Sequence, residues 1–454
     1  MTPLEAQAYL DSFINHENNL ECCDRTTFKL EGVKRLLNLL GAPHRKIPFI
    51  HVAGTKGKGS TSAFIAFILK EAGYKVGLYT SPHLHEYQER IRILTSSDET
   101  ADSRNPFAGK IADQELARMV SEIQPVVEGL RNDSALGYLS FFEVLTALAI
   151  YYFKQCQVDC AVLETGLGGR LDATNAVKSS VVVLTPISLE HTQLLGSTIE
   201  AIAREKAAII KNKDQRVVVA SQDPEAQRVI KNRCQQYGVK ALWLGEDILP
   251  ARLSQDLRGQ SFQVQIPPHP IWKLKTRLAG THQMTNAALA VGVGESLRHL
   301  GFKISPEAIV RGIENTVWPG RFEVIPFRPL VILDGAHNPA STAALVKTVQ
   351  EILPEMRLTL IFGVSIDKDK KGIARELKKI AQRIIFTRAN HPRACDCTLE
   401  ELRDLFPKQE IMKTQNVPQA LKTAFDKIAE DEALLVSGSL FVVGEAREYF
   451  IKNQ

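Results

Sequence analysis

The sequence predicts an α/β protein with two parts: a P-loop-type, mostly parallel sheet domain with helices on both faces, and a smaller C-terminal Rossmann-like α/β domain. Residues 47–80 have the pattern of a strand, a glycine-rich loop, a helix and a second strand. This is a βαβ unit, in which the two strands are parallel. A second series of strand-like apolar segments begins after residue 317 and contains no glycine loop. We therefore expect two domains, residues 1–316 and residues 317–454.

Length and composition limit the class of protein. A chain of 454 residues exceeds the size of one ordinary hydrophobic core. Its 44% hydrophobic and 24% charged residues are typical of a soluble globular protein, and no apolar run is long enough to span a bilayer. The N-terminal segment contains Glu5, Asp11 and Glu17 and lacks a signal-peptide layout, so we expect a cytoplasmic protein that binds no membrane. The net charge of +5 suits small anionic substrates and does not indicate nucleic-acid binding.

Cysteine usage favours reduced thiols. The chain has seven cysteines, an odd number without two closely spaced pairs of the zinc-site type. They are Cys22, Cys23, Cys156, Cys160, Cys234, Cys395 and Cys397.

The first 46 residues predict helices that pack on the following sheet. Thr2 to Glu5 have the pattern of a capping box, and an apolar stripe runs from Leu36 to Leu40. Glycine and proline at positions 41 and 43 then indicate a turn.

The glycine-rich loop predicts a phosphate site. An apolar strand, residues 47–53, precedes it and a helical pattern, residues 61–72, follows it, with Gly73 placed to end the helix in a left-handed conformation. Glycine lets bare backbone N–H groups approach a phosphate at a helix N-terminus. We expect Lys58 to reach the β- and γ-phosphates and Ser60 to offer a hydroxyl group. The spacing departs from Walker A because Gly59 follows Lys58, and the alternative is a glycine turn with incidental lysines.

Polar residues follow the next strands of the predicted sheet. Ser81 comes directly after the strand of residues 75–80, at the edge where parallel sheets bind ligands. Residues 95–108 predict an exposed loop, and residues 141–154 a helix. The strand of residues 159–164 ends in Glu164, which has the layout of an acid beside nucleotide-bound Mg²⁺; an acid facing solvent is the alternative.

Residues 166–175 contain three glycines followed by polar side chains. Arg170 suits a carboxylate ligand, while Asp172 and Asn175 suit the donor groups of a heterocycle; a plain turn explains the glycines alone. The strand of residues 180–186 leads to His191, a candidate metal ligand or phosphate contact, although a lone histidine is usually structural. In the helix of residues 198–211, Lys206 alone predicts no more than a solvated lysine.

The rest of the chain predicts a small antiparallel patch and then the second domain. After a strand at 216–220, residues 240–280 alternate in hydrophobicity, residues 280–300 form a helix, and residues 316–320 indicate a hinge. Further strands are expected at 330–334, 358–363, 383–387 and 433–437. Asp334 at a strand end suits recognition of a ribose or a phosphate-linked metal ion, whereas a helix-capping turn accounts for Asn338 but not for His337.

Over nearly its whole length the chain resembles the folylpolyglutamate synthase and dihydrofolate synthase branch of the Mur ligase superfamily. The Gly-Leu-Gly-Gly-Arg-Leu-Asp-Ala-Thr-Asn run is the most specific motif, and the loop with glycine after lysine marks the branch. The sequence departs from the family pattern at Lys56, where asparagine is common, and at Glu190, where aspartate is common. The motifs that carry the resemblance are residues 54–60, 81–84, 166–175, 191–192, 205–206, 319–321 and 334–338.

The resemblance implies a set of site residues. Lys58, His191 and Lys206 are the implied catalytic residues, with Lys206 carbamylated. The nucleotide site comprises Gly54, Thr55, Gly57, Lys58, Gly59, Ser60, Asn286, Arg321, Asp334 and His337. The pteroyl site comprises Phe142, Glu143, Arg170, Asp172 and Ala173, with Phe142 stacked on the ring. Two Mg²⁺ sites are implied, one at Ser81 and Glu164 and one at His191.

The resemblance also implies the reaction, which is ATP-dependent addition of L-glutamate to dihydropteroate or a folate through an acyl phosphate. Phosphorylation makes the carboxylate a better electrophile and supplies a leaving group. Two alternatives remain at this point: a Mur ligase that acts on a UDP-linked sugar peptide, and an ATP-binding switch that is not a ligase. We expect a monomer.

Overall fold

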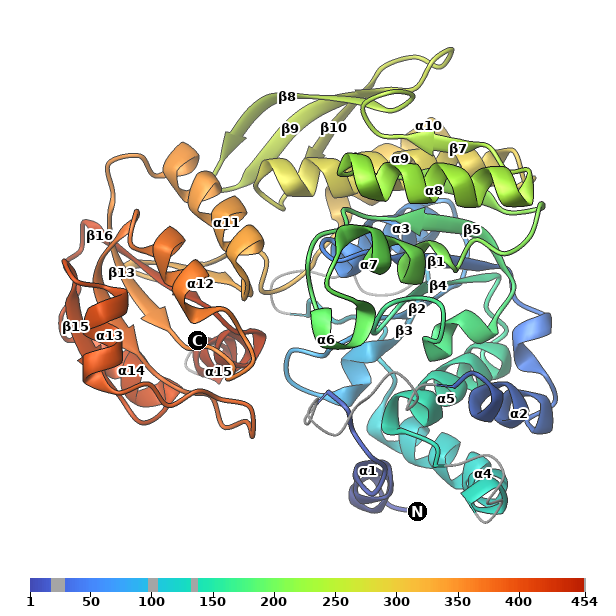
Figure 1. Ribbon diagram of the computed structural model, residues 1–454, viewed down its shortest axis with the longest axis horizontal. Coiled ribbons are helices and arrows are strands. Elements are labelled where there is room, and N and C mark those ends of the chain that lie inside the picture. Colours follow the sequence, from blue (N-terminus) through green and yellow to red (C-terminus); the bar gives the residue numbers. More distant parts are fainter. Residues whose placement is uncertain (18–28, 97–104, 132–137, 453–454) are drawn as a thin grey trace. The chain divides into compact units, whose positions relative to one another are not determined.

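The computed structural model describes residues 1–17, 29–96, 105–131 and 138–452 and divides into two compact units (Figure 1). The larger unit comprises Met1–Ala251, Phe262–Leu274 and Thr285–Thr316. The smaller comprises Arg252–Ser261, Lys275–Met284 and Val317–Gln454. One division falls after Thr316, within the predicted hinge, but two segments from inside the predicted 1–316 domain group with the smaller unit.

A seven-stranded sheet in the order β3-β2-β4-β1-β5-β6-β7 forms the centre of the larger unit. All neighbouring strands pair in parallel except β3, which pairs with β2 in the antiparallel sense at one edge. The mostly parallel sheet predicted from the sequence is therefore confirmed. The strands are β1 (Phe49–Ala53), β2 (Val76–Tyr79), β3 (Ile91–Leu94), β4 (Cys160–Glu164), β5 (Ser179–Leu184), β6 (Arg216–Val219) and β7 (Ala241–Trp243).

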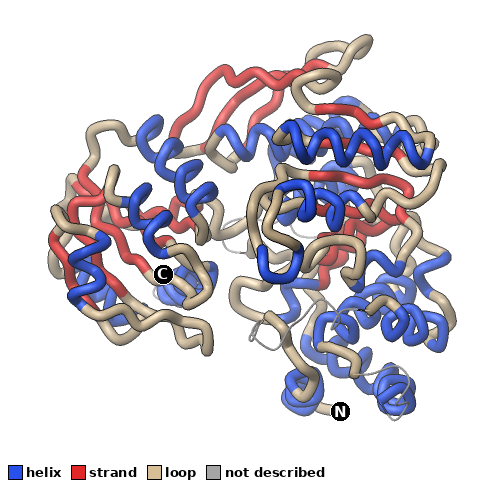
Figure 2. The backbone as a smooth tube through the Cα atoms, in the orientation of Figure 1, coloured by secondary structure: helices blue, strands red, loops and turns tan. Residues whose placement is uncertain are grey.

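Helices cover both faces of this sheet (Figure 2), as the sequence predicts. The N-terminal helices, α4 and α5 share one hydrophobic core with β1, β2 and β4, and α7 and α8 share a second core with β5 and β6. A capping box between Thr2 and Glu5 starts α1, as predicted. The helices are α1 (Pro3–Asp11), α2 (Glu31–Leu39), α3 (Lys58–Glu71), α4 (Asp113–Arg131), α5 (Phe141–Gln155), α6 (Thr192–Leu195), α7 (Ile199–Ala207), α8 (Pro224–Tyr237), α9 (Thr281–Arg298) and α10 (Pro306–Asn315), with 3₁₀ turns η1 (Pro43–Arg45), η2 (Tyr87–Arg90) and η3 (Ala173–Ala176).

The smaller unit contains a six-stranded sheet in the order β11-β12-β16-β13-β14-β15. Only the edge strand β11 is antiparallel to its neighbour, so this unit is also a helix-covered parallel sheet. The strands are β11 (Glu323–Ile325), β12 (Leu330–Asp334), β13 (Arg357–Phe362), β14 (Ala381–Phe386), β15 (Glu410–Lys413) and β16 (Glu432–Ser437). The helices are α11 (Pro339–Ile352), α12 (Lys370–Leu377), α13 (Leu399–Leu405), α14 (Val417–Phe425) and α15 (Leu440–Lys452).

Several details differ from the sequence prediction. The predicted antiparallel patch is a three-stranded sheet of β8 (Leu249–Asp256), β9 (Gly259–Gln265) and β10 (Trp272–Thr276), but its first segment, β7, joins the large sheet instead. The short edge strands β3, β11 and β15 are absent from the sequence prediction. Helix α3 begins at Lys58, inside the stretch predicted as loop, and Gly73 has the expected positive φ of 90°.

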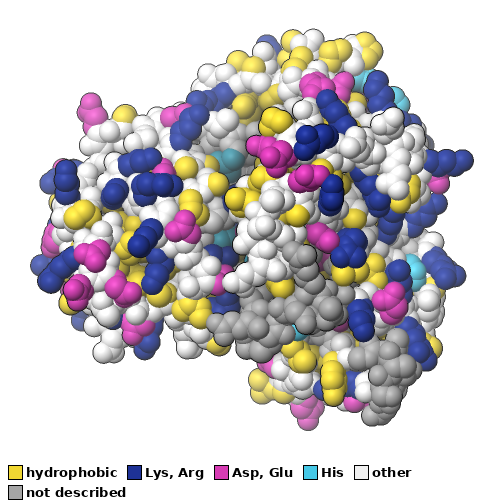
Figure 3. Space-filling model, in the orientation of Figure 1, with side chains coloured by type: hydrophobic (Ala, Val, Ile, Leu, Met, Phe, Trp, Pro, Cys, Tyr) yellow, Lys and Arg dark blue, Asp and Glu magenta, His cyan; other side chains and the backbone are white. Residues whose placement is uncertain are grey.

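Two predicted features fall partly or wholly outside the described residues. Cys22 and Cys23 lie outside them, as does most of the predicted loop at 95–108, although Ala108 at its end is buried. The cysteines that the structure describes are free thiols. Within the described ranges, no helix is both long and apolar enough to cross a membrane. On the face drawn in Figure 3, acidic and basic side chains are interspersed, so the net charge is not gathered into one patch there.

The contact between α3 and α10 gives a test of the packing. A Cβ on Gly312 of α10 would lie 2.4 Å from the Cα of Ile68 in α3. Because that neighbour is backbone and cannot rotate away, we expect Gly312→Ala to destabilise the protein by about 1–3 kcal/mol, measured from urea unfolding.

Gly129→Ala is the matched control. Gly129 is also helical, but it is exposed, and a Cβ added there would have no neighbour within 4 Å. At this position we expect stabilisation of about 0.5–1 kcal/mol, because alanine reduces the entropy of the unfolded chain. Equal effects of the two substitutions would contradict the close α3–α10 contact.

Candidate functional site

The glycine-rich loop leaves the carboxyl end of β1 and is anchored to the segment that follows β5. The N–H groups of Thr55 and Lys56 donate to the carbonyl of Pro186, at 2.9 and 3.3 Å. The Thr55 hydroxyl donates to the carbonyl of Ser188 and accepts from the Ser188 N–H, both at 3.1 Å. These bonds hold the loop against the adjacent strand end, with Lys58 as the first residue of α3.

Two glycines of the loop occupy positions that no other residue fits. Gly54 has φ of 151°, and a Cβ there would lie 1.8 Å from the hydroxyl oxygen of Thr185. Gly57 has φ of 82°, and its Cβ would lie 2.3 Å from the side-chain oxygen of Asn286. The structure thus brings Asn286, from distant helix α9, directly against the loop. The family resemblance assigns Asn286 and this loop to the same nucleotide site.

Glu164 and Ser81 meet at neighbouring strand ends. Glu164 closes β4, whose register with β1 pairs it with Val52. Its carboxylate accepts a hydrogen bond from the Ser81 N–H at 3.2 Å, and the side chain is only 4% exposed. The alternative of an acid facing solvent is therefore wrong. A carboxylate and a hydroxyl are hard oxygen ligands of the kind that Mg²⁺ uses together with substrate phosphates.

Glu89 braces the Ser81 segment, and the sequence did not indicate this residue. Its carboxylate accepts the N–H groups of Leu84 and His85, at 2.6 and 3.0 Å. Burial raises its pKa to about 7, against the lowering effect of those hydrogen bonds. A glutamate in a short 3₁₀ turn has no local signature, so only the fold identifies it.

His191 and Glu190 follow β5. His191 caps α6 with a positive φ of 48°. Burial opposes ionisation of Glu190, but the positive charges of Lys58, His191, Lys56 and Lys206 outweigh it and lower its pKa to about 2. Glu190 is therefore an anion in the field of the glycine-loop lysines, whereas the sequence marked it only as a departure from the family's aspartate.

Lys206 is buried, so the solvated lysine that the sequence alone predicted is wrong. The side chain is 3% exposed, and Nζ donates a hydrogen bond to the carbonyl oxygen of Gly54 at 2.7 Å. Burial, followed by repulsion from Lys58, lowers the pKa of Lys206 from 10.5 to about 7. Near neutral pH a large fraction of this amine is uncharged and nucleophilic.

The loop of residues 166–175 packs between α5 and α7, and its glycines make both contacts possible. A Cβ on Gly166 would lie 2.6 Å from the ring of Phe142. A Cβ on Gly169 would lie 2.7 Å from the carbonyl oxygen of Glu205 and 3.0 Å from the Cα of Lys206. The structure therefore brings together Phe142, this loop and the helix that carries Lys206.

Polar side chains of this region already have partners in the protein. Asp172 accepts the N–H groups of Leu167 and Thr174, at 2.8 and 3.0 Å, and burial raises its pKa. Arg170 is exposed, and its Nε lies 3.0 Å from Glu205. These contacts stabilise the loop itself. From the sequence, the same side chains were expected to bind a ligand.

Glu143 and Ala173 also have local roles. Glu143 forms the capping box of α5 with Ser140, accepting its N–H at 2.8 Å and its hydroxyl at 2.7 Å. Burial raises the pKa of Glu143. Ala173 is 4% exposed and begins η3.

In the smaller unit, the predicted residues gather where β12 ends. Asp334 accepts the N–H groups of Phe322 and Ala336, at 2.8 and 2.9 Å, and burial raises its pKa while Arg321 lowers it. Ring Nδ1 of His337 lies 2.8 Å from the carbonyl oxygen of Gly335, which itself adjoins Arg321. Asn338 caps α11 through the N–H of Ser341, so the helix-cap interpretation of Asn338 is confirmed.

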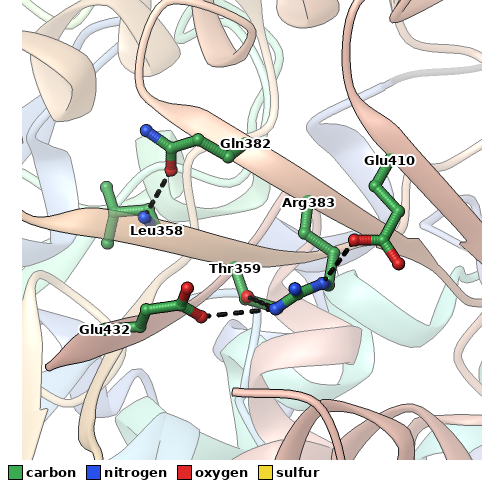
Figure 4. Close-up of a pocket in the computed structure, with 6 residues that line it drawn as sticks. All are labelled: Leu358, Thr359, Gln382, Arg383, Glu410 and Glu432. Carbon is green, nitrogen blue, oxygen red and sulfur yellow. Dashed lines mark hydrogen bonds and ion pairs between the residues drawn. The ribbon is translucent and has the colours of Figure 1, made fainter. Parts of the chain in front are cut away.

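A recess elsewhere in the smaller unit is occupied by ion-paired side chains and is not a candidate ligand site (Figure 4). It lies at the opposite edge, where β13, β14 and β16 begin. Arg383 fills it, with Nε 2.9 Å from Glu410 and Nη1 3.3 Å from Glu432 and 3.0 Å from Thr359. The Nε and Nη1 groups of the guanidinium thus already have partners within the protein.

No group of three or more histidine, cysteine or acidic side chains suited to a metal ion occurs among the described residues. A cation bound by Glu164 and Ser81 therefore needs further oxygen ligands that do not come from a cluster of acidic side chains. This fits Mg²⁺, which commonly binds through one or two carboxylates plus substrate phosphates and water.

Comparisons with known proteins identify the family and the fold of the chain. The Mur ligase middle domain matches residues 141–294, and the Mur ligase, glutamate ligase domain matches residues 320–440. The sequence is 35% identical over 431 residues to dihydrofolate synthase/folylpolyglutamate synthase of Bacillus subtilis, covering 92% of this chain and 94% of that protein. Mycobacterium tuberculosis folylpolyglutamate synthase complexed with ADP and AMPPCP superposes with a TM-score of 0.85 and 30% identity over 98% of each chain. Escherichia coli FolC in complex with DHPP and ADP gives a TM-score of 0.82 and 30% identity over 99% of this chain and 98% of that one.

The buried amine of Lys206 predicts a pH-dependent stability. Its pKa is about 7 in the folded protein and 10.5 when unperturbed, so the unfolded chain binds more protons between these values. The free energy of unfolding therefore falls as the pH is lowered from about 10.5 to about 7, because the unfolded chain takes up a proton on Lys206 that the folded protein does not. Lys206 causes no such loss above about pH 10.5, and the loss is complete below about pH 7. Relative to Lys206→Met, the wild type should become more stable as the pH rises from 7 to 10, measured by urea unfolding in CO₂-free buffer. A constant difference across that range would contradict the burial of this amine.

Proposed function

The chain belongs to the dihydrofolate synthase and folylpolyglutamate synthase family of Mur ligases, and we propose that it is an ATP-dependent ligase that joins L-glutamate to a pteroyl or folate carboxylate through an acyl phosphate. Family membership supports the class of reaction. The observation that carries the site is the meeting of the glycine-rich loop, Glu164 and buried Lys206 at the carboxyl ends of β1, β4 and β5. One rim therefore offers groups for a triphosphate and for a divalent cation.

The chemistry needs an activated carboxylate because a free carboxylate is a poor electrophile with no good leaving group. Its oxygen attacks the γ-phosphorus of ATP, and the bond from that phosphorus to the bridging oxygen breaks, which releases ADP. The uncharged amine of glutamate then adds to the acyl phosphate carbon, loses a proton, and displaces inorganic phosphate as the carbon–oxygen bond breaks. In this scheme the loop N–H groups and Lys58 hold the phosphates and balance the charge that develops during transfer. Gly54, Thr55, Gly57, Gly59 and Ser60 shape that cradle.

For Mg²⁺ we propose Ser81 and Glu164 as holders of one ion and His191 as a holder of a second. The adjacency of Ser81 and buried Glu164 supports the first assignment. Magnesium supplies neutralisation of the phosphate charge when it is bound. Glu190, with its pKa near 2, adds fixed negative charge next to His191.

Lys206 is the proposed carbamylation site. Addition of CO₂ requires an uncharged amine, which attacks the carbon and loses a proton to give a carbamate. The burial of Lys206 and its pKa of about 7 favour that amine near neutral pH. The carbamate replaces the amine with an anion, which would match a cation held by His191.

For the pteroyl group we propose the surface formed by Phe142 and the loop of residues 166–175. The tip of the Phe142 ring approaches Gly166, so this aromatic side chain borders the loop. Glu143, Arg170, Asp172 and Ala173 are the other proposed contacts. Since Asp172 and Glu143 already accept hydrogen bonds from their own segments, each offers only its remaining lone pairs to a ligand.

For the nucleotide we propose Asn286 in the larger unit, because it lies against Gly57 of the loop. In the smaller unit we propose Arg321, Asp334 and His337 as further nucleotide contacts. The support is their gathering at one strand end, where α/β sheets commonly bind ligands. The scheme uses side chains from one copy of the chain.

A substrate-dependence assay tests the function. Purified protein with ATP and Mg²⁺ should release phosphate, and form a product one glutamate heavier, only when L-glutamate and a pteroyl substrate are both present. Dihydropteroate and tetrahydrofolate are offered in parallel, with a UDP-linked sugar peptide as a third acceptor. Ligation of the UDP substrate alone, or phosphate release that ignores glutamate, would overturn the proposal.

The variant Lys58→Met tests the proposed role of Lys58 in phosphate binding. Removing the lysine should lower turnover on the order of a hundred- to thousand-fold, because phosphate charge is no longer balanced, while the circular dichroism spectrum is unchanged. Lys240→Met is the control, since Lys240 is exposed and precedes the edge strand β7 at the opposite end of the sheet. Near-normal turnover in Lys58→Met would refute its role.

Chemical rescue tests the carbamate. In Lys206→Ala, turnover should fall and should return in part when acetate or another short carboxylate is added, because the free anion replaces the carbamate. Lys211→Ala is the comparison, because Lys211 follows the same helix but donates to Asn175. Absence of rescue, full activity without added anion, or equal rescue of both variants would count against carbamylation.

A further inference from the structure

Two cysteines of the smaller unit lie in contact within the loop between β14 and α13. The sulfur atoms of Cys395 and Cys397 are 3.5 Å apart. The N–H of Cys395 donates to the carbonyl of Val364 at 2.8 Å, which ties this loop to the one after β13. Neither cysteine is among the residues assigned above to the reaction.

A lysine stands beside both sulfurs. Lys370 begins α12, and its Nζ lies 3.7 Å from the sulfur of Cys395 and 3.9 Å from that of Cys397. The nearest acid is Glu401 of α13, 3.9 Å from the same Nζ. A cation next to a thiol stabilises its thiolate, which is the form that reacts with oxidants.

We propose that Cys395 and Cys397 form a dithiol modification site for peroxides, with Lys370 as the cation that stabilises the reacting thiolate. The product is an intramolecular disulfide that a dithiol reductant reverses. The proposal concerns the smaller unit alone and is independent of the ligase assignment.

Exposure of the whole residue distinguishes the two cysteines. Cys395 is 6% exposed and Cys397 is fully buried. The Cys395 thiolate therefore attacks one peroxide oxygen, which breaks the O–O bond and leaves a sulfenic acid, while the departing oxygen takes a proton to give water. The Cys397 thiol then attacks that sulfur, loses its proton, and displaces the hydroxyl as a second water. One peroxide is reduced and two thiols are oxidised.

The surrounding contacts hold the sulfurs ready for this reaction. The N–H of Ile366 donates to the carbonyl of Arg393 at 2.9 Å, and Arg393 pairs with Asp367 at 2.6 Å. The two loops are thus joined at Arg393 and at Cys395, on the N-terminal side of the dithiol. The sulfurs need to approach only from contact distance to a bond of about 2.05 Å. A metal ion is the less favoured occupant, since two thiols offer few ligands and Lys370 repels a cation.

Peptide mapping of the intact protein is the first test. Trypsin releases residues 394–403, which contain both cysteines, so a disulfide makes this peptide two hydrogens lighter and protects it from iodoacetamide. With increasing hydrogen peroxide, we expect this peptide to oxidise before Cys234, a buried cysteine whose pKa burial raises to about 11. Treatment with dithiothreitol should restore full alkylation. If both cysteines stay alkylatable at peroxide levels that oxidise Cys234, the proposal is wrong.

Serine variants test the assigned order. In Cys397→Ser the sulfenic acid has no partner, so dimedone should label Cys395. In Cys395→Ser, dimedone should leave Cys397 unlabelled. Labelling of Cys397 alone would overturn the roles given to the two sulfurs.

The role of the lysine has a matched control in the same helix. Lys370→Met should slow disulfide formation about tenfold, because the variant lacks the positive charge that lies beside both sulfurs. Lys371→Met, at the exposed neighbouring position, should leave the rate unchanged. Equal rates in both variants would refute a role for Lys370, and circular dichroism checks that each variant is folded.

Discussion

The parallel pairing of β1 with both β4 and β5 is the constraint on which the proposed site depends. Because the three strands run in the same direction, their carboxyl ends meet at one edge of the sheet. The glycine-rich loop, Glu164 and the segment before His191 all leave from that edge. A change in register of one strand would separate the phosphate-type loop from the carboxylate, so the ligase chemistry rests on backbone hydrogen bonds before it rests on any catalytic side chain.

The charge arrangement at this edge explains how a lysine is tolerated inside the protein. Lys206 is partly deprotonated near neutral pH, because burial and the charge of Lys58 lower its pKa. Glu190 stays ionised, because several cations surround it and lower its pKa. The result is a site where one amine is uncharged and one carboxylate is fixed. An uncharged amine is the form that the proposed carbamylation requires, and neither property follows from the residue types alone.

The dithiol of the smaller unit illustrates the same dependence on contacts. Cysteines two residues apart carry no particular signal in the sequence, and Lys370 is more than twenty positions away. They meet because the loops after β13 and β14 are joined by backbone hydrogen bonds. Glu89 is comparable, since it shapes the Ser81 segment through two backbone N–H groups and has no motif of its own.

The sequence by itself determined the α/β class, the strand, loop and helix around Gly54–Ser60, and the capping of α1, because each follows from periodicity or residue type within one short segment. It also marked Glu164 and the loop of residues 166–175 through the chemistry that follows a buried strand. Only the tertiary structure decided that Lys206 is buried, that Asn286 lies against Gly57, and that Glu190 stands among lysines. The physical reason is that burial, pKa and orientation depend on segments far apart in the chain, whereas a local pattern records only its own neighbours.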